Sequence, residues 1–155
     1  MNRQINAELQ ASHAYLSMAA YFSRDNVALP GLHKFFLNSS HEEREHAEKL
    51  ISYQGTRGGR VHLDAITAPE MEWKSARNAV ETALQMEKAV NASLLDLHKL
   101  GEEHGDSQLC DYIATEFLEE QVKSLKEIAD MLTNLNRVGN DGVGLFLFDK
   151  ELERK

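Results

Sequence analysis

Apolar residues recur at spacings of three and four along four long stretches of the chain, which is the pattern of helices that bury one face. The stretches lie at about residues 1–24, 32–54, 72–100 and 108–137, and glycine, proline or short polar residues separate them. A shorter apolar segment at 143–152 predicts a fifth, small helix. The pattern predicts an all-α fold, and a length of 155 residues fits a single domain over residues 1–155.

The connections between the long helices are short, long and short. Residues 25–31 form a turn with Pro30 suited to a first helical turn, and in the turn at 101–107 either Asp106 or Ser107 can cap the next helix. Residues 57–71 are unusually long for a connection and can run the height of a bundle, which would leave the second and third helices parallel. We therefore predict a four-helix bundle with one long crossover plus a short C-terminal fifth helix; a helical array of another topology is the alternative.

Each predicted core stripe is apolar at its ends and polar near its middle. Each helix contributes one carboxylate or carboxamide there: Glu8, Glu43, Glu87 and Gln121. Burying unpaired like charges is costly, and the stripes contain no lysine or arginine to neutralise them. A multivalent metal ion is the neutralising group that remains. The alternative is that these residues lie at the surface, as in a metal-free helical signalling bundle.

The spacing of the polar residues indicates which metal. Glu43 and His46 are three apart on one helical face and can reach the same ion. Together with Glu8 they form half of the pattern by which bundle proteins bind two iron or manganese ions. Mixed oxygen and imidazole ligands suit iron, with manganese and zinc as competitors. Tyr15, on the same stripe as Glu8, can place its hydroxyl against a ligand carboxylate.

The second half of the chain repeats this pattern in weaker form. Glu87 is followed by Gln121-x-x-Ser124, with Gln in place of Glu and Ser in place of His. A second ion would have Glu87, a share of Glu43, and Gln121 or water as further candidates. A weakly held second ion suits a site that passes its metal onward.

The composition of the chain limits the kinds of partner and the cellular compartment that we expect. The chain has 25 acidic and 17 basic residues and a net charge of −8, which argues against nucleic acid and anionic membranes and is compatible with cations. No stretch has the apolar length of a membrane span, and the opening residues resemble neither a signal nor a transit peptide. The single Cys110 cannot form an internal disulfide, so we expect a reducing, cytoplasmic location.

The chain carries, in order, the motifs INAELQASHAYLSM, HEEREHAEKL, RGGRVHL, NASLLDLHKL, FLEEQVKSLKEI and LFLFDKE. On these motifs it resembles, over essentially its whole length, ferritin of the heavy-chain, ferroxidase-competent type. Ferritin light chains typically have lysine at the position of Glu43. The resemblance implies a ferroxidase centre where two Fe²⁺ per chain react with O₂ to a bridged diferric species that moves on to a ferric oxyhydroxide mineral. That centre falls on Glu8, Tyr15, Glu43, His46, Glu87 and Gln121.

The resemblance also implies a homo-oligomer, a hollow octahedral cage of 24 subunits with the mineral inside. Glu42, Glu45 and Glu48 would then face the cavity and help to nucleate mineral. The alternative is a solvated face on which Glu45 pairs with Lys49. The N-terminal segment by which animal ferritins pack neighbouring subunits precedes the point where the resemblance begins, and we expect it to bear on the assembly number.

In such a cage an acidic three-fold channel admits iron. Its first acidic position matches Asp111, with Cys110 and His98 nearby, but the second, usually glutamate, is Ala114. We therefore expect slower iron uptake than in a cage that carries both acids. The competing interpretation of the whole chain is a non-catalytic mineral or metal-storage scaffold of the same fold.

Overall fold

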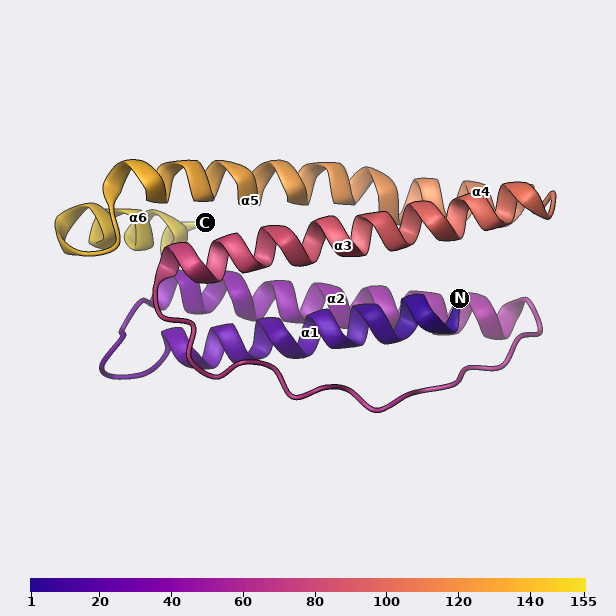
Figure 1. Cartoon of the computed structure of the whole chain (residues 1–155), viewed down its shortest axis with the longest axis horizontal. Coiled ribbons are helices and arrows are strands. Elements are labelled where there is room, and N and C mark those ends of the chain that lie inside the picture. The colour runs from indigo at the N-terminus through magenta and orange to yellow at the C-terminus, as the bar shows by residue number, and fades with distance from the viewer.

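Two antiparallel helical hairpins form the bundle in the computed structural model, which describes residues 1–155. The first pairs α1 (Asn2–Phe22) with α2 (Pro30–Thr56). The second pairs α3 (Ala76–Glu103) with a long helical run made of α4 (Ser107–Ile113), the π-helical turn η1 (Ala114–Leu118) and α5 (Glu119–Val138), and α6 (Gly142–Arg154) follows. Helices α2 and α3 run in the same direction (Figure 1), so the predicted topology is confirmed. No helix combines the length and apolar composition needed to cross a bilayer.

Two apolar clusters fill the bundle interior. One contains the stacked rings of Tyr15, Phe36 and Phe22, with centroids 6.0 and 5.6 Å apart along the series. The other surrounds Ile5 and Phe117, both buried. Because Glu8 lies between Ile5 and Tyr15 on α1, the polar middle of each stripe lies between the two clusters.

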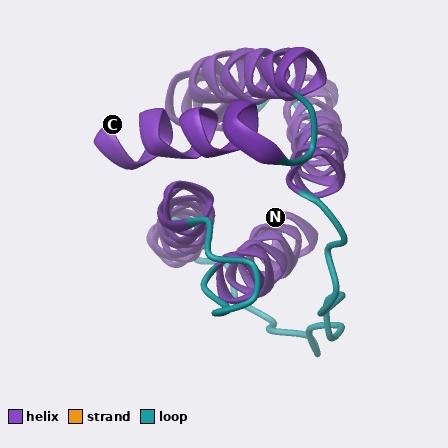
Figure 2. Ribbon diagram, turned by 90° about the vertical axis from the view of Figure 1, so that its left-hand side faces the viewer, coloured by secondary structure: helices purple, strands orange, loops and turns teal.

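The crossover runs the length of the bundle in an extended conformation beside α1 (Figures 1 and 2). Three side-chain amides on successive turns of α1 hold it: Asn2, Asn6 and Gln10. Each amide donates to a backbone carbonyl of the crossover and accepts a bond from one of its backbone N–H groups. These bonds satisfy backbone groups that an extended segment would otherwise leave to solvent.

The third helix begins later than the sequence predicts. We expected it near residue 72, but α3 begins at Ala76, where the Ser75 hydroxyl accepts a bond from the Asn78 backbone N–H at 3.0 Å. Trp73 turns into the core and Lys74 has a φ of 67°, which a right-handed helix does not allow. The crossover therefore covers residues 57–75.

The fourth helix is not a regular α-helix throughout. We expected one helix over 108–137, but the π-helical turn η1 divides it into α4 and α5. Phe117 within η1 is buried, and its ring packs edge-on against His46 at 5.6 Å. π-Turns often occur at functional sites. Asp106, one of the two candidate caps, accepts a bond from the Leu109 N–H at 3.1 Å.

The short helix α6 folds back across the end of the bundle, where Figure 2 shows it in front. Its Asp149 is buried, and the carboxylate accepts bonds from the backbone N–H groups of Gly31 (3.1 Å) and Leu32 (2.8 Å) in the first turn of α2. A carboxylate at a helix N-terminus satisfies unpaired N–H groups and complements the helix dipole. Gly31 allows this approach, since a Cβ there would lie 2.0 Å from the Asp149 carbonyl oxygen.

Removing this cap should weaken the fold. We expect Asp149→Ala to lower the free energy of unfolding of the metal-free protein by about 1–3 kcal/mol, because two buried N–H groups lose their acceptor. Urea unfolding followed by circular dichroism measures this. Glu151→Ala, an exposed change on the same helix, is the control; equal midpoints for the two variants would contradict the role of Asp149.

Candidate metal centre

Glu8 of α1 and Glu43 and His46 of α2 meet in the middle of the bundle. All three are buried, and one ligand atom from each lies within 4.8 Å of the others. The His46 Nδ1 is 3.9 Å from Glu8 Oε2 and 3.9 Å from Glu43 Oε1. Two metal–ligand bonds of about 2 Å keep two ligands of one ion within about 4 Å of each other, so these separations are just short enough for a shared ion. The half of the pattern that the sequence shows as complete is therefore assembled in space.

Two carboxylate oxygens in this cluster have no hydrogen-bond partner: Glu8 Oε2 and Glu43 Oε2. A buried acceptor without a partner costs about 1–3 kcal/mol, and more when it is charged. A cation that bound both oxygens would remove that cost. The donor set and its unpartnered atoms thus fit a divalent metal ion. The burial of all three glutamates also contradicts the metal-free signalling bundle, which required them at the surface.

Glu87 of α3 lies beside this cluster rather than within it. The Tyr15 hydroxyl donates to Glu87 Oε1 at 2.5 Å, and the Gln121 Nε2 donates to Glu87 Oε2 at 3.2 Å. Glu43, His46 and Glu87 line one cavity. Each Glu87 oxygen keeps a free lone pair. Gln121 faces Glu87 with its NH₂ group, and in this arrangement it orients the carboxylate instead of presenting its own oxygen.

Burial and mutual contacts shift the protonation of the three central residues. Burial, with the negative charges of Glu8 and Glu87, holds the pKa of Glu43 well above its usual value. Burial also acts to raise the pKa of Glu8, but the neighbouring His46 and Glu43 and the hydrogen bond from Gln4 outweigh it and lower this pKa. Burial acts to lower the pKa of His46, and the two carboxylates overcome it and raise this pKa to about 11. The metal-free centre therefore holds protons where a metal ion would bind.

Two residues at the centre were not predicted from the sequence. Gln4, one helical turn before Glu8, is buried and donates from Nε2 to Glu8 Oε1 at 2.8 Å. Glu120 of α5 places its Oε2 3.2 Å from His46 Nε2. The i, i+4 relation to Glu8 could have indicated Gln4. Nothing in the sequence indicates Glu120, because its side chain is only half-buried and reaches His46 only in the folded bundle.

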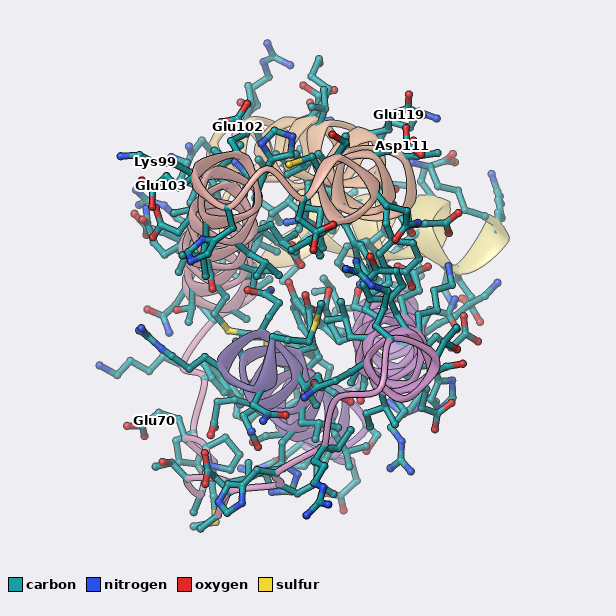
Figure 3. The ribbon with its side chains drawn as sticks, turned by 90° about the vertical axis from the view of Figure 1, so that its right-hand side faces the viewer. Glu70, Lys99, Glu102, Glu103, Asp111 and Glu119 are labelled. Carbon is teal, nitrogen blue, oxygen red and sulfur yellow. The ribbon has the colours of Figure 1, made fainter.

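Glu120 should set the orientation of the His46 ring. A carboxylate on one imidazole nitrogen fixes the proton there and leaves the other nitrogen, here Nδ1, free for metal. We expect Glu120→Ala to weaken Zn²⁺ binding at the centre by about 10-fold. Competition with a chromophoric chelator measures the affinity. Glu119→Ala is the control, since Glu119 projects outward (Figure 3); equal affinities for both variants would refute this role.

The predicted nucleation residues Glu42, Glu45 and Glu48 are all exposed on α2. Only Glu42 also lines the cavity of the centre, where the partial burial of its carboxylate, together with the charge of Glu120, raises its pKa. Glu48 accepts a bond from Arg44 at 3.0 Å. The alternative pairing of Glu45 with Lys49 is wrong, because Lys49 lies 3.9 Å from Glu116 instead.

The predicted channel residues lie together at the end of the bundle where α3 turns into α4. The Cys110 thiol donates to the His98 carbonyl oxygen at 3.5 Å, and Asp111 is exposed and points away from the bundle in Figure 3. Ala114 is the first residue of η1. These residues stay candidates for a channel that only an assembly of several chains would complete.

Comparison with known proteins shows which family the chain belongs to. Residues 1–138 match the family Ferritin, described as a ferritin-like domain. The chain belongs to the ferritin family. It is 60% identical over 152 residues to the soma ferritin of Lymnaea stagnalis, an alignment that covers 97% of this chain and 87% of that protein. Membership supports iron storage, and the buried Glu8, Glu43 and His46 of this ferritin are a candidate site for the iron.

Proposed function

We propose that this chain is a ferroxidase subunit of the heavy-chain type, which oxidises Fe²⁺ with O₂ inside its own bundle. The observation that supports this most directly is the pair of unpartnered oxygens, Glu8 Oε2 and Glu43 Oε2, on two buried carboxylates that cluster with the buried His46. In this proposal the first Fe²⁺ binds Glu8, Glu43 and His46. The second binds Glu43 and Glu87, with Gln121 and Tyr15 orienting the Glu87 carboxylate.

The ligand charges favour oxidation. Each Fe²⁺ gives one electron to O₂, so a pair of ions supplies the two electrons that a single ion cannot. Three carboxylates in a buried site stabilise the trivalent product more than the divalent substrate, because the attraction scales with the charge of the ion. The protein thus supplies metal positioning and charge stabilisation, and iron is its substrate.

The surroundings of the centre favour release of the product. A cavity of about 190 Å³ borders Glu43, His46 and Glu87 and reaches the surface past the exposed Glu42 and Glu127. Ser124 lines the same cavity where a second histidine would hold iron more tightly. Ferric ions can therefore move from the weaker second site toward the carboxylates at the cavity mouth. We propose that Glu42, with Glu45 and Glu48 on the same helix, receives them where mineral forms.

Ferritins generally assemble into multi-subunit cages, and we propose a 24-subunit octahedral cage for this chain. The exposed apolar side chains of α6, Val143, Phe146 and Leu147, are suited to an interface between subunits. The one cysteine, Cys110, is free, which is consistent with a cytoplasmic location.

Aerobic addition of two Fe²⁺ per subunit tests the ferroxidase proposal. We expect rapid O₂ consumption and a transient coloured species, both saturating near two Fe²⁺ per subunit. A non-catalytic storage scaffold would still bind metal at this centre but would consume O₂ no faster than Fe²⁺ in buffer. That result would contradict the proposed activity.

The channel proposal makes a separate prediction. We expect Ala114→Glu to raise the initial oxidation rate at limiting Fe²⁺ by a few fold, because a second acidic ring beside Asp111 attracts cations more strongly. Stopped-flow absorbance at low ionic strength measures the rate, and the gain should shrink as salt is added. Ala114→Gln controls for side-chain size; an unchanged rate in Ala114→Glu would show that this position does not limit uptake.

A further inference from the structure

A glutamine and a serine that are not proposed ligands form a chain of hydrogen bonds to one proposed ligand, Glu8. Gln4 of α1 is 2% exposed although its amide is polar. Its Nε2 donates to Glu8 Oε1 at 2.8 Å, and its Oε1 accepts a bond from the Ser93 hydroxyl of α3 at 2.5 Å. The amide thus bonds through its NH₂ group to Glu8 of α1 and through its oxygen to Ser93 of α3.

The direction of these bonds fixes the orientation of the amide. An ionised carboxylate only accepts hydrogen bonds, so the amide must turn its NH₂ group toward Glu8. Its oxygen then faces Ser93, which can donate. A flipped amide would set two oxygen atoms against each other at Glu8 and leave the Ser93 hydroxyl to serve as acceptor. Ser93 therefore reinforces the one orientation in which Gln4 donates to Glu8.

As a result, only one of the two Glu8 oxygens has a hydrogen-bond partner. Gln4 occupies Oε1, while Oε2 has no partner and lies 3.9 Å from His46 Nδ1. Glu43 has no comparable donor on its Oε2, which is likewise without a partner. Glu8 Oε1 keeps a lone pair, as the Glu87 oxygens do, but the bond from Gln4 makes it a weaker donor to metal than Oε2. Glu8 is thus prepared to bind a single ion through Oε2, and Glu43 is left free to offer both oxygens.

We propose that Gln4, held by Ser93, is a positioning residue that makes Glu8 a one-oxygen ligand and so reserves the remaining coordination positions of the first ion for substrate and solvent. This inference rests on the metal-binding part of the proposed function, but it does not require the oxidation step. Open coordination positions are what separate a catalytic metal site from a closed, structural one.

Co²⁺ binding to the full chain tests this without oxidation, because the visible spectrum of Co²⁺ becomes weaker as its coordination number rises. The variants are Gln4→Met, which keeps the volume and removes both bonds, and Ser93→Ala. We expect both to weaken the first Co²⁺ by roughly 10-fold. We expect Gln4→Met also to lower the absorption per bound ion, since Glu8 can then bind through both oxygens. Ser93→Thr, which keeps the hydroxyl, should restore wild-type affinity.

Gln10→Met is the matched control, because Gln10 is on the same helix but bonds the backbone of Thr67 in the crossover. If Gln4 had a merely structural role, Gln4→Met would change the unfolding midpoint and leave the Co²⁺ spectrum and affinity of the folded chain unchanged. That result would overturn this inference but not the proposed function. Failure of the wild-type chain to bind Co²⁺ at the centre would overturn the proposed function as well.

Discussion

Glu43→Leu should reduce rapid Fe²⁺ oxidation by about 100-fold or more. In the proposed function Glu43 is the residue that contacts both ions, whereas losing a residue that only orients a ligand typically costs 10–100-fold. The remaining rate should approach that of Fe²⁺ in buffer. Stopped-flow absorbance with parallel O₂ measurement follows the reaction, and the same loss is expected when His46→Leu is added.

The same variant should separate metal binding from folding. Glu43→Leu removes a buried oxygen that has no hydrogen-bond partner, so the metal-free variant should unfold with a free energy about 1–3 kcal/mol higher than that of the wild type. Zn²⁺ at about 100 times its Kd should stabilise the wild type by about 2.7 kcal/mol and the variant by much less. Glu45→Leu, an exposed change on the same helix, is the control. Retained fast oxidation in Glu43→Leu would refute the assignment of the centre.

Metal affinity should fall steeply as the pH falls. In the metal-free chain the pKa of His46 is raised to about 11, so the ring is protonated at neutral pH and must lose a proton when metal binds. Each proton displaced weakens binding about tenfold for every unit by which the pH drops. The raised pKa of Glu43 adds a second displaced proton on the acidic side. We expect the Zn²⁺ affinity to fall about 10- to 100-fold per pH unit below neutrality.

Calorimetric titration of Zn²⁺ in two buffers with different ionisation enthalpies counts the released protons. We expect at least one proton per first ion, and one fewer in His46→Asn. Affinity that does not depend on pH, with no proton release, would show that the metal-free centre does not hold the protons inferred here.

Most of the fold could be predicted from the apolar pattern, because long helices with a single buried stripe leave a clear periodicity. The candidate ligands could be predicted for a related reason: Glu8, Glu43 and Glu87 break apolar stripes at positions where a charge is costly. Their burial is confirmed, and their binding of metal stays a prediction. The order of helices and the length of the crossover then determined which helices run parallel.

The features that the pattern missed depend on contacts between distant parts of the chain. In the sequence, Asp149 looks like an ordinary charged residue near a helix end. It is buried only because α6 lies over the first turn of α2 in the folded chain. Gln4 lies beside the apolar stripe and acquires its role from Ser93 on another helix. The π-turn η1 adds one residue to a helical turn without introducing glycine or proline, so no breaker marks it.

Crystals of the chain soaked anaerobically in Fe²⁺ and measured at the iron absorption edge test the central claim most directly. We predict two anomalous peaks inside each bundle, one in contact with Glu8, Glu43 and His46 and the other, of lower occupancy, between Glu43 and Glu87. A bundle interior without iron, or with iron only at the exposed acidic residues, would contradict the account.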